Sequence, residues 1–143
     1  MARSVITELK IPAASDFIPV AKRVASTLGS QLGFSLQELD ELNIAVAQAC
    51  DSAIDASEDA WGGGASLKLT YSATDRGIEV EVQAIGPRSP QALPRPALSP
   101  AVRDAEFQRV AQEMIRCFVD DFHSRVDAGR GQVRFRMVKY LIV

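Results

Sequence analysis

Several side chains that could take up protons or ligate a metal ion share one face of a predicted helix. The segment 35–57 carries them opposite its apolar stripe, and they are Glu41, Gln48, Asp51, Ser52 and Asp55. Carboxylates gathered in this way could act as a general base or hold a divalent cation. For Asp51 and Asp55 we favour the alternative of a solvated helix face, and for Ser52 we expect a local hydrogen bond.

The other reactive side chains have no partners at catalytic or metal-ligating spacing. Cys50 and Cys117 are expected to be buried thiols of a reducing compartment rather than a metal site or a disulfide framework. His123 stands alone on a predicted strand, so we expect it to be exposed or hydrogen-bonded rather than catalytic. Trp61 precedes three glycines, and we expect it to cover the edge of the core rather than to anchor a partner.

The composition indicates a single soluble globular domain over residues 1–143. The chain is 47% hydrophobic and 24% charged, with a net charge of −2, which excludes a disordered tail. A pI near 5.4 argues against a nucleic-acid-binding protein that works by bulk charge. No stretch has the length and apolarity of a membrane span, and the first residues lack the apolar core of a secretory signal. We therefore expect a cytoplasmic protein that binds neither nucleic acid nor membrane.

Apolar periodicity and turn signals predict five strands and three helices. The strands are expected at 5–11, 67–71, 78–82, 122–126 and 133–140, and the helices at 15–29, 35–57 and 102–120. Ser15 or Asp16 is expected to cap the first helix, with Pro19 in its first turn, and Ser35 and Glu38 form a capping box for the second. This order predicts an α+β two-layer sandwich with helices on one face of a mixed sheet.

Each predicted helix carries an apolar stripe that we expect to face the core. The first stripe is Phe17, Val20, Val24, Thr27 and Leu28, the second is Leu39, Leu42, Val46, Ala49, Cys50 and Ala53, and the third is Phe107, Val110, Met114, Ile115 and Phe118. The first strand is expected to turn Val5, Thr7, Leu9 and Ile11 inward. A run of prolines from Pro87 to Pro100 excludes both helix and central strand, so we expect an extended loop there.

Four short motifs in this order resemble those of the bacterial anti-sigma factor serine kinases. They are LKIPA at 9–13, LNIAVAQACDSA at 42–53, MIRCFVDD at 114–121 and KYL at 139–141. The chain resembles the RsbW and SpoIIAB type of this family, which belongs to the GHKL ATPase superfamily with histidine kinases and gyrase. The resemblance covers nearly the whole chain. It implies a GHKL fold with a nucleotide site, in which the segment 87–100 replaces the ATP lid.

The resemblance also implies the positions of a catalytic base and a metal ligand. The family's general base is a glutamate at the position of Gln48, and an amide cannot accept a proton at neutral pH. The family's Mg²⁺-ligating asparagine is replaced by Ser52, whose hydroxyl has a shorter reach and would ligate a metal only if Mg-ATP binds. Asp51 or Asp55 would have to replace the missing base in an active kinase.

The residues with which the family binds the adenine and the phosphates of the nucleotide are replaced as well. In its D-x-G-x-G box, Ala84 replaces the aspartate that accepts the adenine amino group, Gly86 is retained, and Arg88 replaces the last glycine. In the second glycine box, expected to open the last helix, Arg109 and Ala111 replace the glycines that let amides approach phosphate. The resemblance therefore implies a degenerate nucleotide site with no cofactor, or Mg-ATP if the site is retained.

Basic side chains mark two candidate partner surfaces. Lys22 and Arg23 lie where the family carries a partner-contacting arginine, and ordinary surface charge is the alternative. The last hairpin carries Arg130, Arg134 and Arg136, and alternation puts 134 and 136 on one face. These arginines would form a phosphate or partner patch, or they would block edge-to-edge pairing of strands.

We therefore expect a protein-binding regulator of the anti-sigma type. It would bind a sigma factor, an anti-anti-sigma (STAS) protein or both in a partner-switching pathway, and the resemblance implies a homodimer. One alternative is an active ATP-dependent serine/threonine kinase that phosphorylates the anti-anti-sigma factor. Another is a GHKL-fold scaffold for a different signalling protein.

Overall fold

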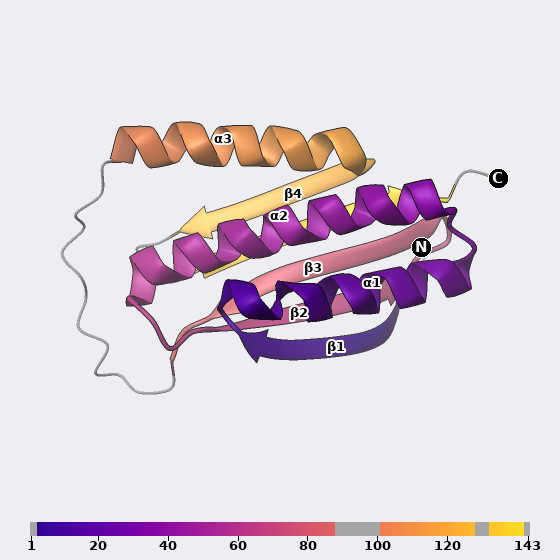
Figure 1. The fold of residues 1–143 in the computed structure, drawn as a ribbon, viewed down its shortest axis with the longest axis horizontal. Coiled ribbons are helices and arrows are strands. Elements are labelled where there is room, and N and C mark those ends of the chain that lie inside the picture. Colours follow the sequence, from indigo (N-terminus) through magenta and orange to yellow (C-terminus); the bar gives the residue numbers. More distant parts are fainter. Residues whose placement is uncertain (1–2, 88–100, 128–131, 142–143) are drawn as a thin grey trace.

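The computed structural model describes residues 3–87, 101–127 and 132–141 (Figure 1). The predicted loop at 88–100, the turn at 129–131, Arg88 and Arg130 lie outside these residues. The described chain forms one five-stranded sheet and three α-helices, in the expected sequence order.

All strand pairs in the sheet are antiparallel, so the expectation of a mixed sheet was wrong. The strands β1 (Ser4–Pro12), β2 (Ser66–Ala73), β3 (Gly77–Ile85), β4 (Asp121–Asp127) and β5 (Gln132–Tyr140) lie in the order β1-β2-β3-β5-β4. The connection from β1 to β2 contains two helices. A single crossover helix would return the chain parallel to β1, whereas a pair of helices returns it antiparallel. A single helix connects β3 to β4, which makes these two strands parallel, but β5 lies between them.

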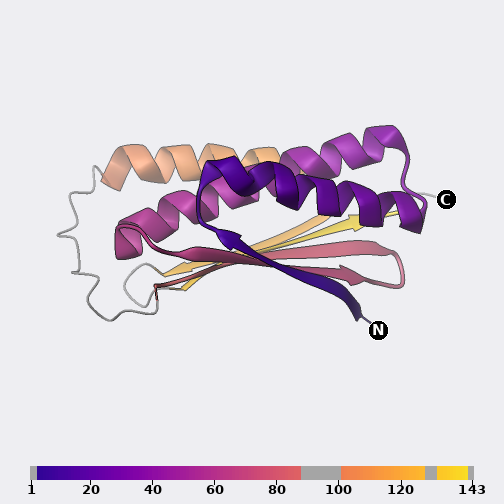
Figure 2. The same cartoon turned by 60° about the horizontal axis from the view of Figure 1, so that its bottom comes forward.

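The helices α1 (Ile18–Leu32), α2 (Leu36–Trp61) and α3 (Ala101–Phe118) cover one face of the sheet and leave the other face bare (Figure 2). The long α2 runs across the middle of the sheet between α1 and α3 (Figure 1). This arrangement confirms the predicted α+β two-layer sandwich. We call the bare side of the sheet the outer face.

The beginning and the buried side of α1 differ from the predictions. Neither Ser15 nor Asp16 caps the helix with its side chain, because residues Ser15–Phe17 form a short 3-10 turn that leads directly into it. Pro19 lies in the first turn, as predicted, and Gly33 ends the helix in the left-handed conformation. The buried residues of α1 are Ile18, Ala21, Ala25 and Gly29. Of the predicted stripe, only Val24 and Leu28 are partly buried against the core.

Close helix packing explains this shift. A Cβ atom at Gly29 would lie 2.5 Å from Cδ2 of Leu39 on α2, so the two helices approach each other where α1 has small residues. The larger Phe17 and Val20 remain 39% and 43% exposed. At this contact, the dispersion energy gained by two closely approaching backbones outweighs the hydrophobic energy that larger side chains would gain between more widely spaced helices.

The prediction for α2 is confirmed in most details. The backbone N–H of Glu38 donates to Ser35 Oγ at 3.2 Å, and the N–H of Ser35 donates to Glu38 Oε1 at 2.9 Å. The helix runs four residues past Ser57 and ends at Gly62 with φ of 78°. The whole predicted stripe is buried, namely Leu39, Leu42, Val46, Ala49, Cys50 and Ala53.

The prediction for α3 is only partly confirmed. Ile115 is fully buried, but Val110 and Met114 are 67% and 45% exposed, and Ala111 and Val119 are buried instead. The side chain of Phe107 lies outside the description. As in α1, a small residue is buried while two larger residues remain at the surface.

The first strand is buried only toward its end. Ile11 is buried and Thr7 and Leu9 are half-buried, whereas Val5 is 52% exposed. A register irregularity between Val5 and Thr7 interrupts the pairing with β2, so the predicted alternation does not extend to the first residues.

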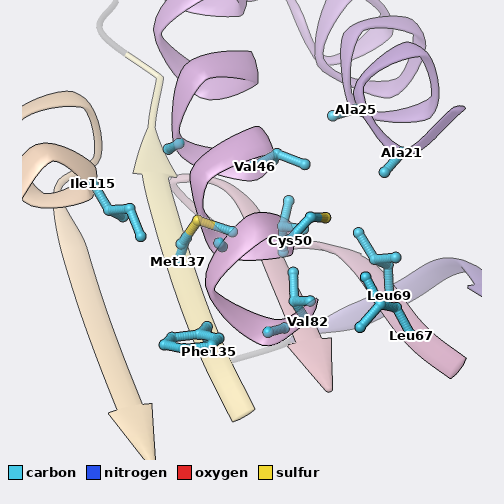
Figure 3. Close-up of a cluster of buried hydrophobic side chains, with 14 of the residues drawn as sticks. Ala21, Ala25, Val46, Cys50, Leu67, Leu69, Val82, Ile115, Phe135 and Met137 are labelled. Atoms are coloured by element: carbon cyan, nitrogen blue, oxygen red, sulfur yellow. The ribbon is translucent and has the colours of Figure 1, made fainter. Parts of the chain in front are cut away.

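The core cluster is mostly apolar and contains the thiol of Cys50 (Figure 3) and the phenol of Tyr71. Burial, and secondarily the charge of Asp51, raises the pKa of Cys50 to about 12. Burial also raises the pKa of Tyr71, whose hydroxyl donates to the carbonyl oxygen of Ala21 at 2.8 Å. Cys117, in contrast, is exposed, so the prediction of two buried thiols was wrong for this residue.

Candidate functional site

Lys139 connects α2 with the end of α3. The helix α2 carries Gln48 and Ser52, the positions at which the resemblance implies a base and a metal ligand. Lys139 lies on the helix-covered face of β5, where it is 7% exposed. Its Nζ atom donates to the carbonyl oxygen of Phe118 at 2.8 Å, at the end of α3, and lies 3.8 Å from Oε2 of Glu41 on α2. Glu41 therefore marks the side of α2 that faces α3.

Ser52 lies on this same side of α2 and is fully enclosed. Helical spacing places Ala45, Ser52 and Ala56 in line with Glu41, and all three are buried. Ser52 is 2% exposed, and its Oγ atom has no hydrogen-bond partner among the described residues. The expected local hydrogen bond is therefore absent there, and the assignment of Ser52 to the polar face was wrong.

The other polar residues of α2 lie nearer the surface. Gln48 is half-buried, and Asp51 and Asp55 are exposed. The solvated face favoured for the two aspartates is thus confirmed. Gln48 and Ser52 lie four residues apart, so they are neighbours on the helix, but only Ser52 is closed off from solvent.

The end of β3 carries Ala84, and Gly86 follows it, at the positions of the D-x-G-x-G box that the resemblance implies. Ala84 is 4% exposed and lies opposite Val133 on the helix-covered face. A Cβ atom at Gly86 would lie 2.7 Å from Cε2 and 2.9 Å from Nε1 of Trp61. The indole therefore lies directly against the backbone of Gly86. Trp61 is half-buried against the core, which confirms that it covers the edge of the core.

The segment 109–111, which the resemblance aligns with the second glycine box, lies inside a helix rather than at its beginning. Because α3 starts at Ala101, residues 109–111 are in its interior, where backbone N–H groups are bonded to carbonyl oxygens of the preceding turn. Arg109 is exposed and Ala111 is 5% exposed. These residues therefore offer no free backbone amides for a phosphate group.

Lys22 and Arg23 lie on α1, far from the residues of both boxes in the sequence. Lys22 is half-buried and Arg23 is exposed. The carbonyl oxygen of Arg23 accepts a hydrogen bond from Thr27 Oγ1 at 2.8 Å, so the helix is regular at this point. Neither side chain forms an ion pair within the part of the chain that the structure describes.

The predicted shared face of Arg134 and Arg136 is confirmed. Both side chains lie on the outer face, where Arg134 Nε is 3.3 Å from Glu81 Oε1 and Arg136 Nε is 3.9 Å from Glu79 Oε1. Arg3 also reaches Glu79, at 2.7 Å. His123 on β4 is exposed and lies 3.1 Å from Asp121, as expected for a surface histidine.

Sequence reasoning missed the role of Lys139, although the sequence carries a signal for it. Val133, Phe135 and Met137 alternate as buried residues, and continuing this alternation puts Lys139 on the helix-covered face. A charged residue at an inward position requires polar partners, which the ends of α2 and α3 provide.

The described residues carry neither a membrane-spanning helix nor a cluster of metal-ligating side chains. None of the helices in these residues is long and apolar enough to cross a membrane. No group of three or more His, Cys, Asp or Glu residues could hold a metal ion within 3–87, 101–127 and 132–141.

Comparison with known proteins shows similarity along almost the whole chain. No family model matches the sequence. A protein of Halalkalibacterium halodurans named serine-protein kinase RsbW is 24% identical over 139 residues, which cover 94% of this chain and 82% of that protein. The protein of the same name from Bacillus licheniformis is 21% identical over 94% of this chain and 84% of its own length. One from Bacillus pumilus is 33% identical over 49 residues, or 34% of this chain and 30% of that protein. This chain is therefore similar to the RsbW-type serine-protein kinases over most of its length.

Proposed function

We propose that this chain is a binding regulator of the anti-sigma type whose ATP binding is lost or weak. It would hold a sigma factor, an anti-anti-sigma (STAS) protein or both, and exchange them in a partner-switching pathway. The observation that carries the proposal is similarity to RsbW proteins over 94% of the chain without the polar groups of the nucleotide site. A binding surface needs only the fold, so it can persist when those groups are replaced.

The residues at the nucleotide positions do not fit Mg-ATP well. Gln48 cannot act as a base, and the Ser52 hydroxyl is buried on α2. Ala84 offers no polar group to an adenine, and the indole of Trp61 lies against Gly86. The amides near Arg109 are held in the helix interior. Each replaced group would otherwise contribute on the order of 1–3 kcal/mol to binding.

A fluorescence titration with Mg-ATP tests the loss of nucleotide binding. Trp61 is the only tryptophan and lies at Gly86, so a nucleotide entering this site would change its emission. We expect no saturable change up to millimolar Mg-ATP and no shift in Tm. Saturation at micromolar ATP, with the corresponding thermal stabilisation, would contradict the proposal.

An active serine kinase is the second candidate, because the similar proteins carry that name. Asp51 would then have to serve as the base, since it is exposed on α2 one turn from Gln48. Incubation with radiolabelled ATP and a candidate anti-anti-sigma protein would then label a serine, and Asp51→Asn would abolish the label. We expect no labelling with either protein.

The binding function is tested by affinity capture from the source cells. We expect the tagged chain to recover a sigma factor or a STAS protein, and we expect Arg23→Glu on α1 to reduce the recovery. Arg76→Glu, an equal charge change at the hairpin between β2 and β3, is the matched control. Recovery of neither class would favour a scaffold for another signalling protein. Sedimentation of the purified chain tests the homodimer that the resemblance implies.

A further inference from the structure

Four cationic side chains form a single row across the outer face of the sheet. The residues of the row lie directly opposite one another in five adjacent strands, in the order Lys10, Lys68, Gln83, Arg134 and Arg125. Directly opposite residues share a face of the sheet, and the strand neighbours Leu69, Val82 and Val133 are buried under the helices, so all five side chains lie on the outer face. Figure 2 shows that α1, α2 and α3 all lie on the other side of the sheet. We call these five residues the cationic row.

The like-charge pairs of the cationic row do not stabilise the sheet. Lys10 lies opposite Lys68, and Arg134 lies opposite Arg125, and like charges directly opposite each other in a sheet are destabilising. Protection of sheet edges would explain Lys10 on β1 and Arg125 on β4, because these are the edge strands. It does not explain Lys68 and Arg134, which lie on interior strands.

The acidic side chains of the neighbouring row neutralise only part of this charge. Glu8 lies 3.8 Å from Lys68, and Glu81 lies 3.3 Å from Arg134. Within 3–87, 101–127 and 132–141, neither Lys10 nor Arg125 forms an ion pair. Among the described residues, each end of the cationic row therefore carries one cationic side chain without an ion-pair partner.

The end of the row at β4 and β5 is hollowed. A pocket of about 170 Å³ is lined there by Arg125, Arg134, Gln83 and Gln132, together with Ala84 and Val133. The two guanidinium groups can each donate two hydrogen bonds to one carboxylate, and the two amides add further donors. This donor set suits an oxyanion.

We propose that the cationic row docks an acidic segment of a partner protein, with one carboxylate group in the pocket at Arg125 and Arg134. The second cationic pair, Lys10 and Lys68, lies three strand spacings away, or about 14 Å. An extended segment spans this distance with acidic groups about four residues apart. The inference deepens the proposed function and rests on it, since it assigns the surface that a partner would use.

A protein segment fits this surface better than a nucleic acid does. Glu8 and Glu81 lie next to the cationic row and would repel a continuous phosphate backbone, whereas separate carboxylates can avoid them. The net charge of −2 also repels a polyanion at longer range, while a short acidic segment is attracted locally.

A labelled octapeptide with the sequence Gly-Glu-Glu-Ser-Ser-Glu-Glu-Gly serves as the probe, and fluorescence anisotropy reports its binding to the full chain. We expect binding that weakens steeply with added salt, and at least fivefold weaker binding by the double variant Arg125→Gln/Arg134→Gln. The double variant Arg76→Gln/Arg116→Gln removes the same charge elsewhere, and we expect its affinity to stay within twofold of the unmodified chain. A peptide with Gln in place of Glu is expected not to bind.

Three outcomes would overturn the inference. They are equal weakening by both double variants, absence of binding at low salt, and tighter binding of a single-stranded oligonucleotide of similar length. Sedimentation of the chain is expected to show the same oligomeric state with and without the peptide. If the peptide dissociated a dimer, a second copy of the chain, and not a partner protein, would cover the cationic row. Because the peptide assay needs no sigma factor or STAS protein, it can fail or succeed independently of the capture experiment.

Discussion

The carboxylate of Asp120 accepts a hydrogen bond from the backbone N–H of Tyr140 at 2.7 Å. This bond joins the two C-terminal motifs that carry the family resemblance, and the next contact, from Lys139 Nζ to Phe118, joins them again. Together the motifs fasten the end of α3 to β5. They therefore have a role in holding the fold together that does not depend on a nucleotide site.

Replacing Lys139 with Met tests this connection. The variant leaves the carbonyl oxygen of Phe118 without its donor and Glu41 without its cation, so we expect unfolding to become easier by about 1–3 kcal/mol. Urea denaturation followed by circular dichroism measures the change. Lys10→Met, at an exposed position, is the control, and an equal loss of stability in both would contradict the role of Lys139.

The capping box makes Ser35 a second stability determinant. Ser35→Ala removes the oxygen that accepts from the N–H of Glu38, and we expect a loss of about 1 kcal/mol. Ser30→Ala, on the exposed side of α1, is the matched control and should change stability by less than about 0.5 kcal/mol. A thermal melt of both variants suffices, and equal Tm values would show that the cap does not stabilise α2 as inferred.

The contact of Trp61 with Gly86 predicts a specific coupling between these residues. Gly86→Ala places a methyl group within 2.7 Å of the indole, so we expect a loss of about 1–3 kcal/mol and a red-shifted Trp61 emission as the ring moves outward. In a Trp61→Ala background the same substitution should cost much less. A double-mutant cycle measures the difference, and additive effects would mean that the two residues are not in contact.

The buried Cys50 thiol predicts a loss of stability in alkaline solution. Its pKa in the folded chain is raised to about 12 from an ordinary value of 9.0, so the unfolded chain releases this proton first as the pH rises. The free energy of unfolding should therefore fall between pH 9 and 12, by at most about 1.4 kcal/mol per pH unit from this group. Tyr71, whose pKa is also raised, acts in the same direction.

Urea denaturation at several pH values from 8 to 11 measures this dependence. Cys50→Ala should reduce the slope, although the variant will be less stable at every pH because it leaves a cavity. Cys117→Ala, at an exposed thiol, should leave the slope unchanged. Identical slopes in the two variants would contradict the assignment to Cys50.

The cationic row predicts that relieving its like-charge pair stabilises the fold. Arg125→Gln removes one member of the pair with Arg134 while keeping the other's contact with Glu81, so we expect a gain of about 0.2–1 kcal/mol. Arg76→Gln is the control, and denaturation at low salt gives the largest difference. A loss of stability in Arg125→Gln would show that the pair is held by interactions within the fold.

The sequence alone determined the features that depend on local pattern. The capping box at Ser35 and Glu38, the stripe of α2 and the hairpin between β2 and β3 all follow from residues within a few positions of one another. Alternation also placed Arg134 and Arg136 on one face. In each case the hydrogen bond or the side-chain direction depends on neighbouring backbone geometry, which amino-acid type strongly restricts.

Only the tertiary structure decided which sides of α1 and α3 are buried and what surrounds each site residue. Close approach of helices selects small residues such as Gly29 and Ala111 over larger ones such as Val20 and Val110, and periodicity does not report that distance. The enclosure of Ser52 depends on the position of α3, and the indole at Gly86 depends on where α2 ends. The cationic row depends on the register of five strands from distant parts of the chain, since pairing distances between strands are set by the packed sheet and not by any local segment.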